Sequence, residues 1–202
     1  MIVTSILGTF GTMLGLVRAM PQLVRLLRTQ EAFGVSVDTA ATSAICSFSW
    51  VVYGSLTHQF FFTLSSGLTG FIFTLIAFFA LRFGRQVEEV KIAPVWFTVL
   101  LLAGVVAGKN GLGLALAISV LVSNIPQLWL AYKENNLSDL SLGTWSISTI
   151  EGATWLTYAI LRQDVAIIVS AFFQTVTSGL IVVLKVARQA KIQRQASKGV
   201  RF

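Results

Sequence analysis

The sequence predicts an all-α, polytopic membrane protein of seven transmembrane helices, built as two parallel three-helix bundles joined by a linker helix. Three observations lead to this prediction. The 202 residues are 55% hydrophobic and only 11% charged, with a mean hydropathy of +0.79. Several apolar runs approach the ~20 residues that a helix needs to cross a bilayer. Two segments around Pro21 and Pro126 also share many residues in one register.

The composition excludes several classes of protein. A soluble domain carries about 25% charged residues, and this chain has too few to cover a surface that faces water, so lipid must solvate much of it. The formal charge is +7, but the basic residues lie at the edges of apolar runs, which argues against nucleic acid binding. The single cysteine, Cys46, excludes a disulfide within the chain.

The seven predicted spans follow from the apolar runs, taken in order. They cover residues 2–27, 37–56, 60–81, 92–108, 111–132, 141–161 and 165–186. Helices are expected because these runs are too long for the strands of a membrane barrel and do not alternate in polarity. In the first span, Gly8, Gly11 and Gly15 have a spacing typical of closely packed membrane helices. The second span is expected to begin at helix caps formed by Ser36 and Asp38.

The fourth span is short and contains Pro94, so the distribution of charge decides whether it crosses. With seven crossings and the N-terminus outside, 12 Lys and Arg residues lie on the cytoplasmic side, against Lys109 and Arg162 outside. If the fourth run did not cross, the count would be seven against seven. Positive residues concentrate on the cytoplasmic side of membrane proteins, which favours seven spans, an outside N-terminus and a cytoplasmic C-terminus.

An internal repeat relates the two halves with an offset of 105 residues (126 − 21). The shared positions include Leu23 with Leu128, Ser36 with Ser141, Thr39 with Thr144, Ser43 with Ser148, Trp50 with Trp155, Tyr53 with Tyr158, Leu56 with Leu161 and Ser65 with Ser170. So long a series without a gap indicates a duplication. We therefore divide the chain into a first repeat at 1–86, a linker helix at 87–109, a second repeat at 110–186 and a basic cytoplasmic tail at 187–202.

The segments "MPQLVRLLRTQEAFGVSVDT" and "IPQLWLAYKENNLSDLSLGT" each carry Pro-Gln in the first helix of a three-helix unit. Two such units around a linker helix resemble the SWEET and PQ-loop transporter family. That family is an example of parallel transporter repeats related by an axis along the membrane normal. The resemblance implies a solute site between the halves, near the bilayer midplane, that opens alternately to each side.

The two Pro-Gln pairs, Pro21 with Gln22 and Pro126 with Gln127, are predicted hinges. A proline within a helix frees the carbonyl one turn earlier and bends the helix, and a glutamine can bridge nearby polar groups. The alternative is a static kink that fits a packed bundle.

Polar side chains follow the second and sixth spans at helical spacing. The stripes comprise Thr39, Ser43, Cys46, Ser47, Trp50 and Tyr53, and Thr144, Ser148, Glu151, Trp155 and Tyr158. Their hydroxyls either join helices or, as we predict for Ser43 and Ser148, contact solute. The resemblance implies that Trp50 and Trp155 stack on the solute; the alternative is an interfacial belt. We predict Tyr53 and Tyr158, at the outer ends of the stripes, as gate residues.

The resemblance also implies an asparagine on the third helix of each unit, bonded to the solute. The corresponding positions here hold Ser66 and Ala171, which depart from that pattern. Gln174, one turn further along, and Asn124 are amides that could substitute. These departures weaken the assignment of a sugar more than the assignment of a transporter.

Glu151 lies about ten residues from each end of its span, and Arg18 lies at a similar predicted depth. A carboxylate at that depth is costly, so it should be protonated, paired or in contact with water. We expect the two side chains to approach each other across the cavity. The pair would serve as a gate or a proton-coupled switch, or as a static link between helices.

The function that these features favour is transport of a small polar solute, first of all a sugar by uniport through the cell membrane. The alternatives are proton-coupled transport of an amino acid or organic cation through Glu151, and a cargo receptor that does not transport. We expect no enzyme activity, no cofactor and no metal site, since His58 lacks ligand neighbours at suitable spacing. Membrane lipid is the expected environment, and a monomer would suffice, although a homo-oligomer is possible.

Overall fold

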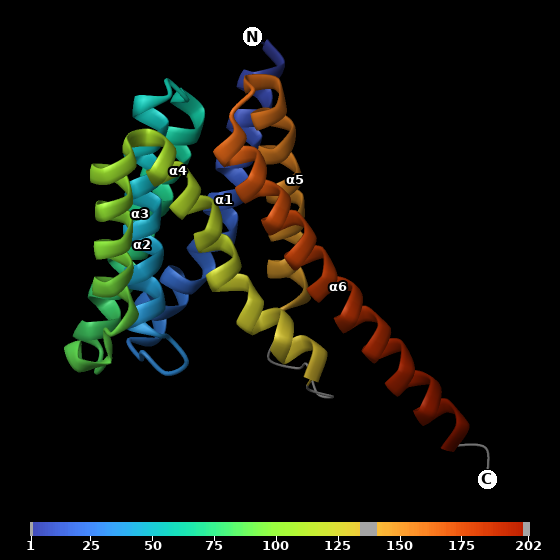
Figure 1. Ribbon diagram of the computed structural model, residues 1–202. Coiled ribbons are helices and arrows are strands. Elements are labelled where there is room, and N and C mark those ends of the chain that lie inside the picture. The colour runs from blue at the N-terminus through green and yellow to red at the C-terminus, as the bar shows by residue number, and fades with distance from the viewer. Residues whose placement is uncertain (1, 134–140, 200–202) are drawn as a thin grey trace.

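The computed structural model describes residues 2–133 and 141–199, without the side chains at 126, 127, 130 and 191–199. Every regular element within these ranges is helical, as the sequence predicts (Figure 1). In chain order they are α1 (Ile2–Thr29), α2 (Val37–Leu56), α3 (Phe60–Arg82), the short 3-10 helix η1 (Val87–Glu89), α4 (Ile92–Lys133), α5 (Leu142–Arg162) and α6 (Val165–Gly199).

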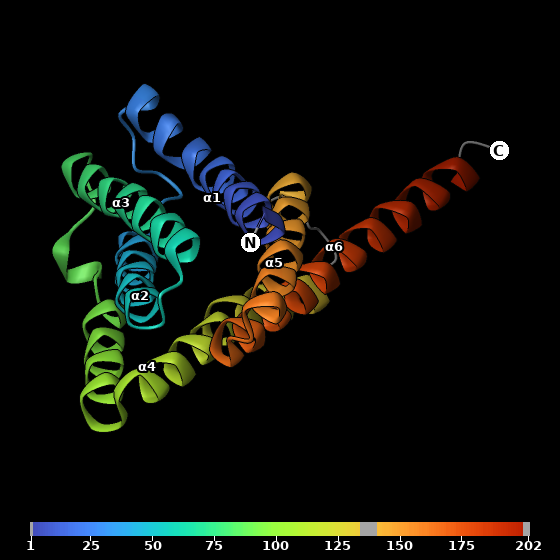
Figure 2. The same ribbon diagram turned by 90° about the horizontal axis from the view of Figure 1, so that it is seen from above.

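Helix α4 consists of two arms that run in opposite directions. Gly108 separates them with a φ of 59° and a ψ of −148°, a combination that only glycine adopts readily. Figures 1 and 2 show the chain turning back at this point and crossing the molecule a second time. The arms correspond to the predicted fourth and fifth spans, so the described chain has seven long helical segments.

The pattern of helix contacts repeats when 105 residues are added. In the first half, α3 packs against both α1 and α2. In the second half, α6 packs against both α4 and α5 in the same way. The halves meet through two equivalent pairs, α1 with α5 and α2 with α4, and Figure 2 shows the two groups beside each other. A space enclosed between the halves therefore has walls from both.

Local structure at the helix ends also repeats. Ser36 accepts a hydrogen bond from the amide of Thr39 at the start of α2, and Ser141 accepts one from Thr144 at the start of α5. The Ser36 cap is thereby confirmed. Asp38 does not cap α2, because its carboxylate accepts bonds from the Lys91, Ile92 and Ala93 amides at the N-terminus of α4. An anion is favoured there by the unpaired amides and the helix dipole.

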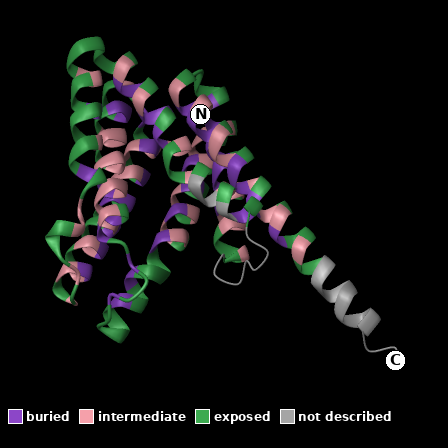
Figure 3. Ribbon diagram, turned by 60° about the horizontal axis from the view of Figure 1, so that its bottom comes forward, coloured by how far each residue is buried: buried purple, intermediate pink, exposed green. Residues whose placement is uncertain are grey.

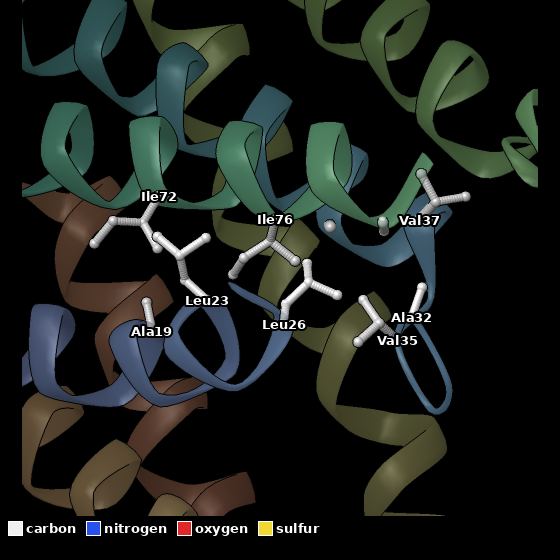
Figure 4. Packing of buried hydrophobic residues seen from close by; sticks show 10 residues of the cluster. Ala19, Leu23, Leu26, Ala32, Val35, Val37, Ile72 and Ile76 are labelled. Carbon is white, nitrogen blue, oxygen red and sulfur yellow. The ribbon is translucent and has the colours of Figure 1, made fainter. Parts of the chain in front are cut away.

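One apolar core joins α1 and α3. Figure 4 shows Ile72 and Ile76 of α3 pointing toward Leu23 and Leu26 of α1. Leu26 and Ile76 are 1% and 0% exposed, and the loop between α1 and α2 adds Val35 to this cluster. Small residues on α1 permit equally close contacts elsewhere.

The glycines that the sequence marks on α1 lie at such contacts. A Cβ on Gly8 would clash with Phe61 Cβ, and one on Gly11 would lie 2.8 Å from a ring carbon of Trp155. Further along α1, a Cβ on Gly15 would lie 3.0 Å from an oxygen of Glu151. The glycines therefore allow α1 to approach both α3 and α5, as predicted.

The outer faces of the bundle are apolar. Among the described residues, four helices are long and apolar enough to cross a bilayer: Ile2–Thr29, Phe60–Arg82, Ile92–Ile125 and Val165–Ala190. Figure 3 shows exposed residues along the outer sides of the helices, and these include many large hydrophobic side chains. Such a surface requires lipid, so the chain is an integral membrane protein. The start of α1 and the described end of α6 lie at opposite ends of the bundle (Figure 1).

Candidate functional site

A cavity of about 470 Å³ lies between the two halves. Ten residues that the sequence analysis selected line its wall: Arg18, Ser43, Trp50, Ser66, Asn124, Ser148, Glu151, Trp155, Ala171 and Gln174. The cavity reaches the first turns of α2 and α4 at Thr39 and Ile92, both exposed, and so opens to the surface at that end. Its polar stripes come from α2 and α5, which explains why these helices carry hydroxyls in a membrane protein.

Aromatic rings close the opposite end of the cavity. Phe62 lies between the two tryptophans, with its ring centre 5.1 Å from that of Trp50 and 5.0 Å from that of Trp155. Tyr53 and Tyr158 extend this row on either side, at 5.4 Å from Trp50 and 5.3 Å from Trp155. All four contacts are edge-to-face, the favoured geometry for aromatic pairs. The tyrosines lie behind the tryptophans and do not line the cavity.

A buried polar network lies beyond the aromatic row. The Tyr53 hydroxyl donates to Asp164 Oδ1 at 2.8 Å, and the Tyr158 hydroxyl donates to Gln59 Oε1 at 3.1 Å. Gln59 Nε2 donates to Asp164 Oδ2 at 3.3 Å, which joins the halves directly. Arg162 Nε also donates to Gln59 Oε1, at 2.9 Å. This end of the molecule is therefore closed by rings and by hydrogen bonds.

Three residues of this end, Phe62, Gln59 and Asp164, were not predicted from the sequence. Gln59 and Asp164 are separated by 105 residues, so the repeat register contained a signal for them. Phe62 aligns with Ile167, and no pattern distinguishes it from the other phenylalanines of α3. Only its position between two rings reveals its place in the site.

The structure places Arg18 and Glu151 in contact. Arg18 Nε donates to Glu151 Oε2 at 2.7 Å, with the side chains 30% and 8% exposed. Arg18 comes from α1 and Glu151 from α5, so the ion pair crosses the interface between the halves. The third charged side chain of the wall is Asp38, which the α4 amides already satisfy.

The two amides that the sequence suggested as substitutes are engaged with the protein. Asn124 Nδ2 donates to Thr177 Oγ1 at 2.8 Å, and Gln174 Nε2 donates to the backbone carbonyl of Ser148 at 3.3 Å. Ala171 contributes only an apolar surface. The cavity wall therefore owes much of its polarity to hydroxyls.

Two of the predicted hinge residues, Pro21 and Gln22, lie away from the cavity. Pro21 lies inside α1, which stays helical, and both Pro21 and Gln22 are exposed. Gln22 bonds to none of the described residues, so it bridges no polar groups in this conformation. Pro126 and Gln127 belong to the second arm of α4, and their side chains are outside the described part of the structure.

The described residues contain no group of three or more His, Cys, Asp and Glu side chains that could hold a metal ion. No protein-family model matches the chain, and no curated protein matches it. A solved structure of a eukaryotic SWEET transporter matches it with a TM-score of 0.76 and 11% sequence identity, over 94% of this chain and 98% of that one. The helix order, the paired halves and this match together show that the chain has the SWEET transporter fold.

Proposed function

We propose that this protein is a membrane transporter that moves a small, neutral, polyhydroxylated solute, such as a sugar, by alternating access. The observation that carries the proposal is the 470 Å³ cavity between the halves, open at one end and closed at the other. Its volume falls in the range of about 300–1,000 Å³ that is typical of small-molecule sites.

The chemistry of the wall supports a polyhydroxylated solute. Tryptophan faces offer apolar surface to the C–H groups of a sugar ring, and Trp50 and Trp155 supply two of them. Serine and threonine hydroxyls can each donate and accept a hydrogen bond, as the hydroxyls of a sugar require. The charges of Arg18 and Glu151 cancel and the amides at the start of α4 bond to Asp38, so the cavity favours no net charge in the solute.

The two ends of the cavity support alternating access. In this conformation the closed end is the one with Lys109 and Arg162, which the distribution of charge assigns to the outside. The structure would then be open to the cytoplasm, and transport would require the network around Asp164 to separate. Pro21 and Pro126 lie toward the open end, where the helices would have to come together. We propose the cell membrane as the location and the monomer as the functional unit, since one chain encloses the cavity.

Uptake into proteoliposomes tests the proposal. The panel comprises radiolabelled hexoses, pentitols, disaccharides, amino acids and organic cations, each measured with and without a pH gradient. We expect saturable uptake of a hexose or polyol without need of the gradient, and a large loss of uptake in Trp50→Ala. Trp129→Ala, an exposed tryptophan outside the cavity wall, is the matched control. Binding without flux would instead indicate a receptor.

A second candidate, proton-coupled transport of an amino acid or organic cation, is favoured by one observation. Glu151 is a buried carboxylate in the cavity wall whose partner, Arg18, could be released if the carboxylate took up a proton. This mechanism predicts uptake that follows the pH gradient in the wild type and loses that dependence in Glu151→Gln. Uptake that is equal at all gradients would exclude it.

A further inference from the structure

Oxygen atoms from two helices converge on Gly15 of α1. Glu151 uses Oε2 for the ion pair with Arg18, and its other oxygen, Oε1, lies on the side of Gly15. A Cβ on Gly15 would lie 3.0 Å from Glu151 Oε1, 3.5 Å from Thr69 Oγ1 and 3.8 Å from Ser65 Oγ. The absence of a side chain at Gly15 thus lets three acceptors gather beside α1, and the residues that carry them line the cavity.

The residues that carry these oxygens are largely buried, but none of the described residues bonds to the oxygens. Glu151, Ser65 and Thr69 are 6%, 6% and 9% exposed. Hydroxyls of membrane helices usually bond to the carbonyl four residues earlier, as Thr74 does with Gly70 at 2.8 Å. Ser65 and Thr69 make no such bond, and Glu151 Oε1 and the two Nη groups of Arg18 have no partner in the described chain either. Among the described side chains, the fully buried oxygens without a partner are Thr42 Oγ1 and Thr63 Oγ1. The three oxygens beside Gly15 therefore remain accessible from the cavity, whose contents can bond to them.

The charge of this group of residues selects the solute. An anion would compete with Glu151 for Arg18, and a cation would compete with Arg18 for Glu151. Either solute would have to break the 2.7 Å contact and leave a charge unpaired within the membrane. A neutral solute can use the spare N–H groups of Arg18 and the spare oxygen of Glu151 while the pair stays intact.

The geometry points to a subsite for a vicinal diol. We propose that Arg18, Glu151, Ser65 and Thr69 bind two adjacent hydroxyls of the solute, one donating to Glu151 Oε1 and one accepting from Arg18 Nη. Ser65 and Thr69 can form a further hydrogen bond with either solute hydroxyl, since each side chain can donate and accept. This inference rests on the proposed function as a carrier of polyhydroxylated solutes. The subsite would provide hydrogen bonds to the solute, which the Ala171 side chain cannot.

The subsite lies within reach of the aromatic row. Gly11, one turn before Gly15 on α1, packs against the Trp155 ring. Four residues of helix rise about 6 Å, a distance that a single sugar ring with its hydroxyls spans. A solute in contact with Trp155 can therefore place a diol beside Gly15.

Three variants test the subsite: Gly15→Ala, whose methyl group would lie 3.0 Å from Glu151 Oε1 and so narrow the subsite, and Ser65→Ala and Thr69→Val, which remove hydroxyls. Gly104→Ala, with its nearest neighbour atom at 3.8 Å, and Thr74→Val are matched controls outside the cavity wall. The ligands are D-glucose, D-mannitol and ribitol, followed by monodeoxy analogues of the tightest binder. Binding is measured by thermal stabilisation in detergent, and transport by uptake into proteoliposomes.

We expect Thr69→Val to weaken binding by about tenfold, the effect of losing one hydrogen bond of about 1.4 kcal/mol. Gly15→Ala should weaken binding to a similar extent by steric hindrance. Removing the matching solute hydroxyl should weaken binding to the wild type but not weaken binding to Thr69→Val further. Wild-type binding and uptake in all three variants would overturn the subsite and leave the proposed function standing. Polyol binding without flux would overturn the proposed function and leave the subsite standing. No binding of any of the three polyols to the wild type would overturn both.

Discussion

Arg18 and Glu151 form the only charge pair that the described structure places across the two halves. Its partners are both needed, because removal of one leaves the other charge without compensation inside the membrane. The two residues come from helices whose sequences give no sign of pairing beyond a similar depth. The contact should therefore couple the stability of the halves.

A double-mutant cycle measures this coupling. Arg18→Gln and Glu151→Gln should each lower the apparent melting temperature, and the double variant should lose less than the sum. We expect a coupling of about 1–3 kcal/mol for residues in such contact. The matched pair is Arg85 and Glu89, at 3.4 Å and about a third exposed, which should show at most about 0.5 kcal/mol, as for other exposed helix pairs. Additive losses at Arg18 and Glu151 would show that the contact does not couple the halves.

Phe62 limits the space between Trp50 and Trp155, although its equivalent in the second repeat is the smaller Ile167. Phe62→Ile should therefore enlarge the outer part of the cavity and raise uptake of a disaccharide relative to a monosaccharide. It should also lower stability by about 1–3 kcal/mol through lost packing. Phe60→Ile, at a side chain 70% exposed, is the control. An uptake ratio equal to that of the wild type would show that Phe62 does not set solute size.

Several residues of the site were predictable and several were not. Trp50, Trp155, Ser43 and Ser148 line the cavity because helical spacing, which the sequence displays, places them on one face of α2 and α5. The sequence indicated Ser65 only as one of the positions that the two repeats share. The convergence of residues on Gly15 was not predictable, because it depends on how closely three helices approach one another and not on the pattern along any one of them.

At the scale of helices, the reversal within α4 depends on one residue. Gly108 has a positive φ that side chains with a Cβ adopt only under strain, and no atom lies within 4 Å of the position of its absent Cβ. A substitution at Gly108 would therefore meet no steric clash and would change stability only through the backbone conformation. The sequence predicts that the fourth span ends at this glycine. The positive φ of Gly108 could not be predicted from the sequence and is seen only in the structure.

Gly108→Ala should lower the free energy of unfolding by about 1–3 kcal/mol, the usual cost of a side chain in this backbone region. Gly104→Ala, in the regular part of the same arm, should leave stability unchanged or raise it, since alanine favours a helix more than glycine does. Thermal unfolding in one detergent compares the two variants. Equal melting temperatures would mean that the reversal adopts another backbone conformation at little cost.

For the whole molecule, the described conformation makes a directional prediction about access. Cys46 is the single cysteine of the chain and lines the cavity. A membrane-impermeant thiol reagent should label it from the side of Asp38 and only slowly from the side of Asp164. Tyr53→Phe and Asp164→Asn remove bonds of the closed end, so both should speed labelling from the Asp164 side. Cys46→Ser, which lacks the thiol, is the negative control. Labelling of the wild type at equal rates from both sides would show that the Asp164 end is not closed.

The overall architecture was largely predictable, because a repeat of 105 residues and the spacing of apolar runs determine the number and order of the helices. The role of Asp38 was not predicted correctly, since its carboxylate bonds to amides more than 50 residues away. Contacts of this kind depend on tertiary structure. The closing network was likewise hidden, although Gln59 and Asp164 occupy equivalent positions in the two halves.

The difference between those two equivalent positions has a consequence for assembly. A symmetric homodimer of the second half alone would bring two Asp164 carboxylates together, where like charges repel, and one of the first half would bring together two Gln59 amides without any charge. In the unequal pair, the Gln59 amide instead donates to the Asp164 carboxylate. The difference between the two positions therefore favours pairing of unlike halves over pairing of two second halves.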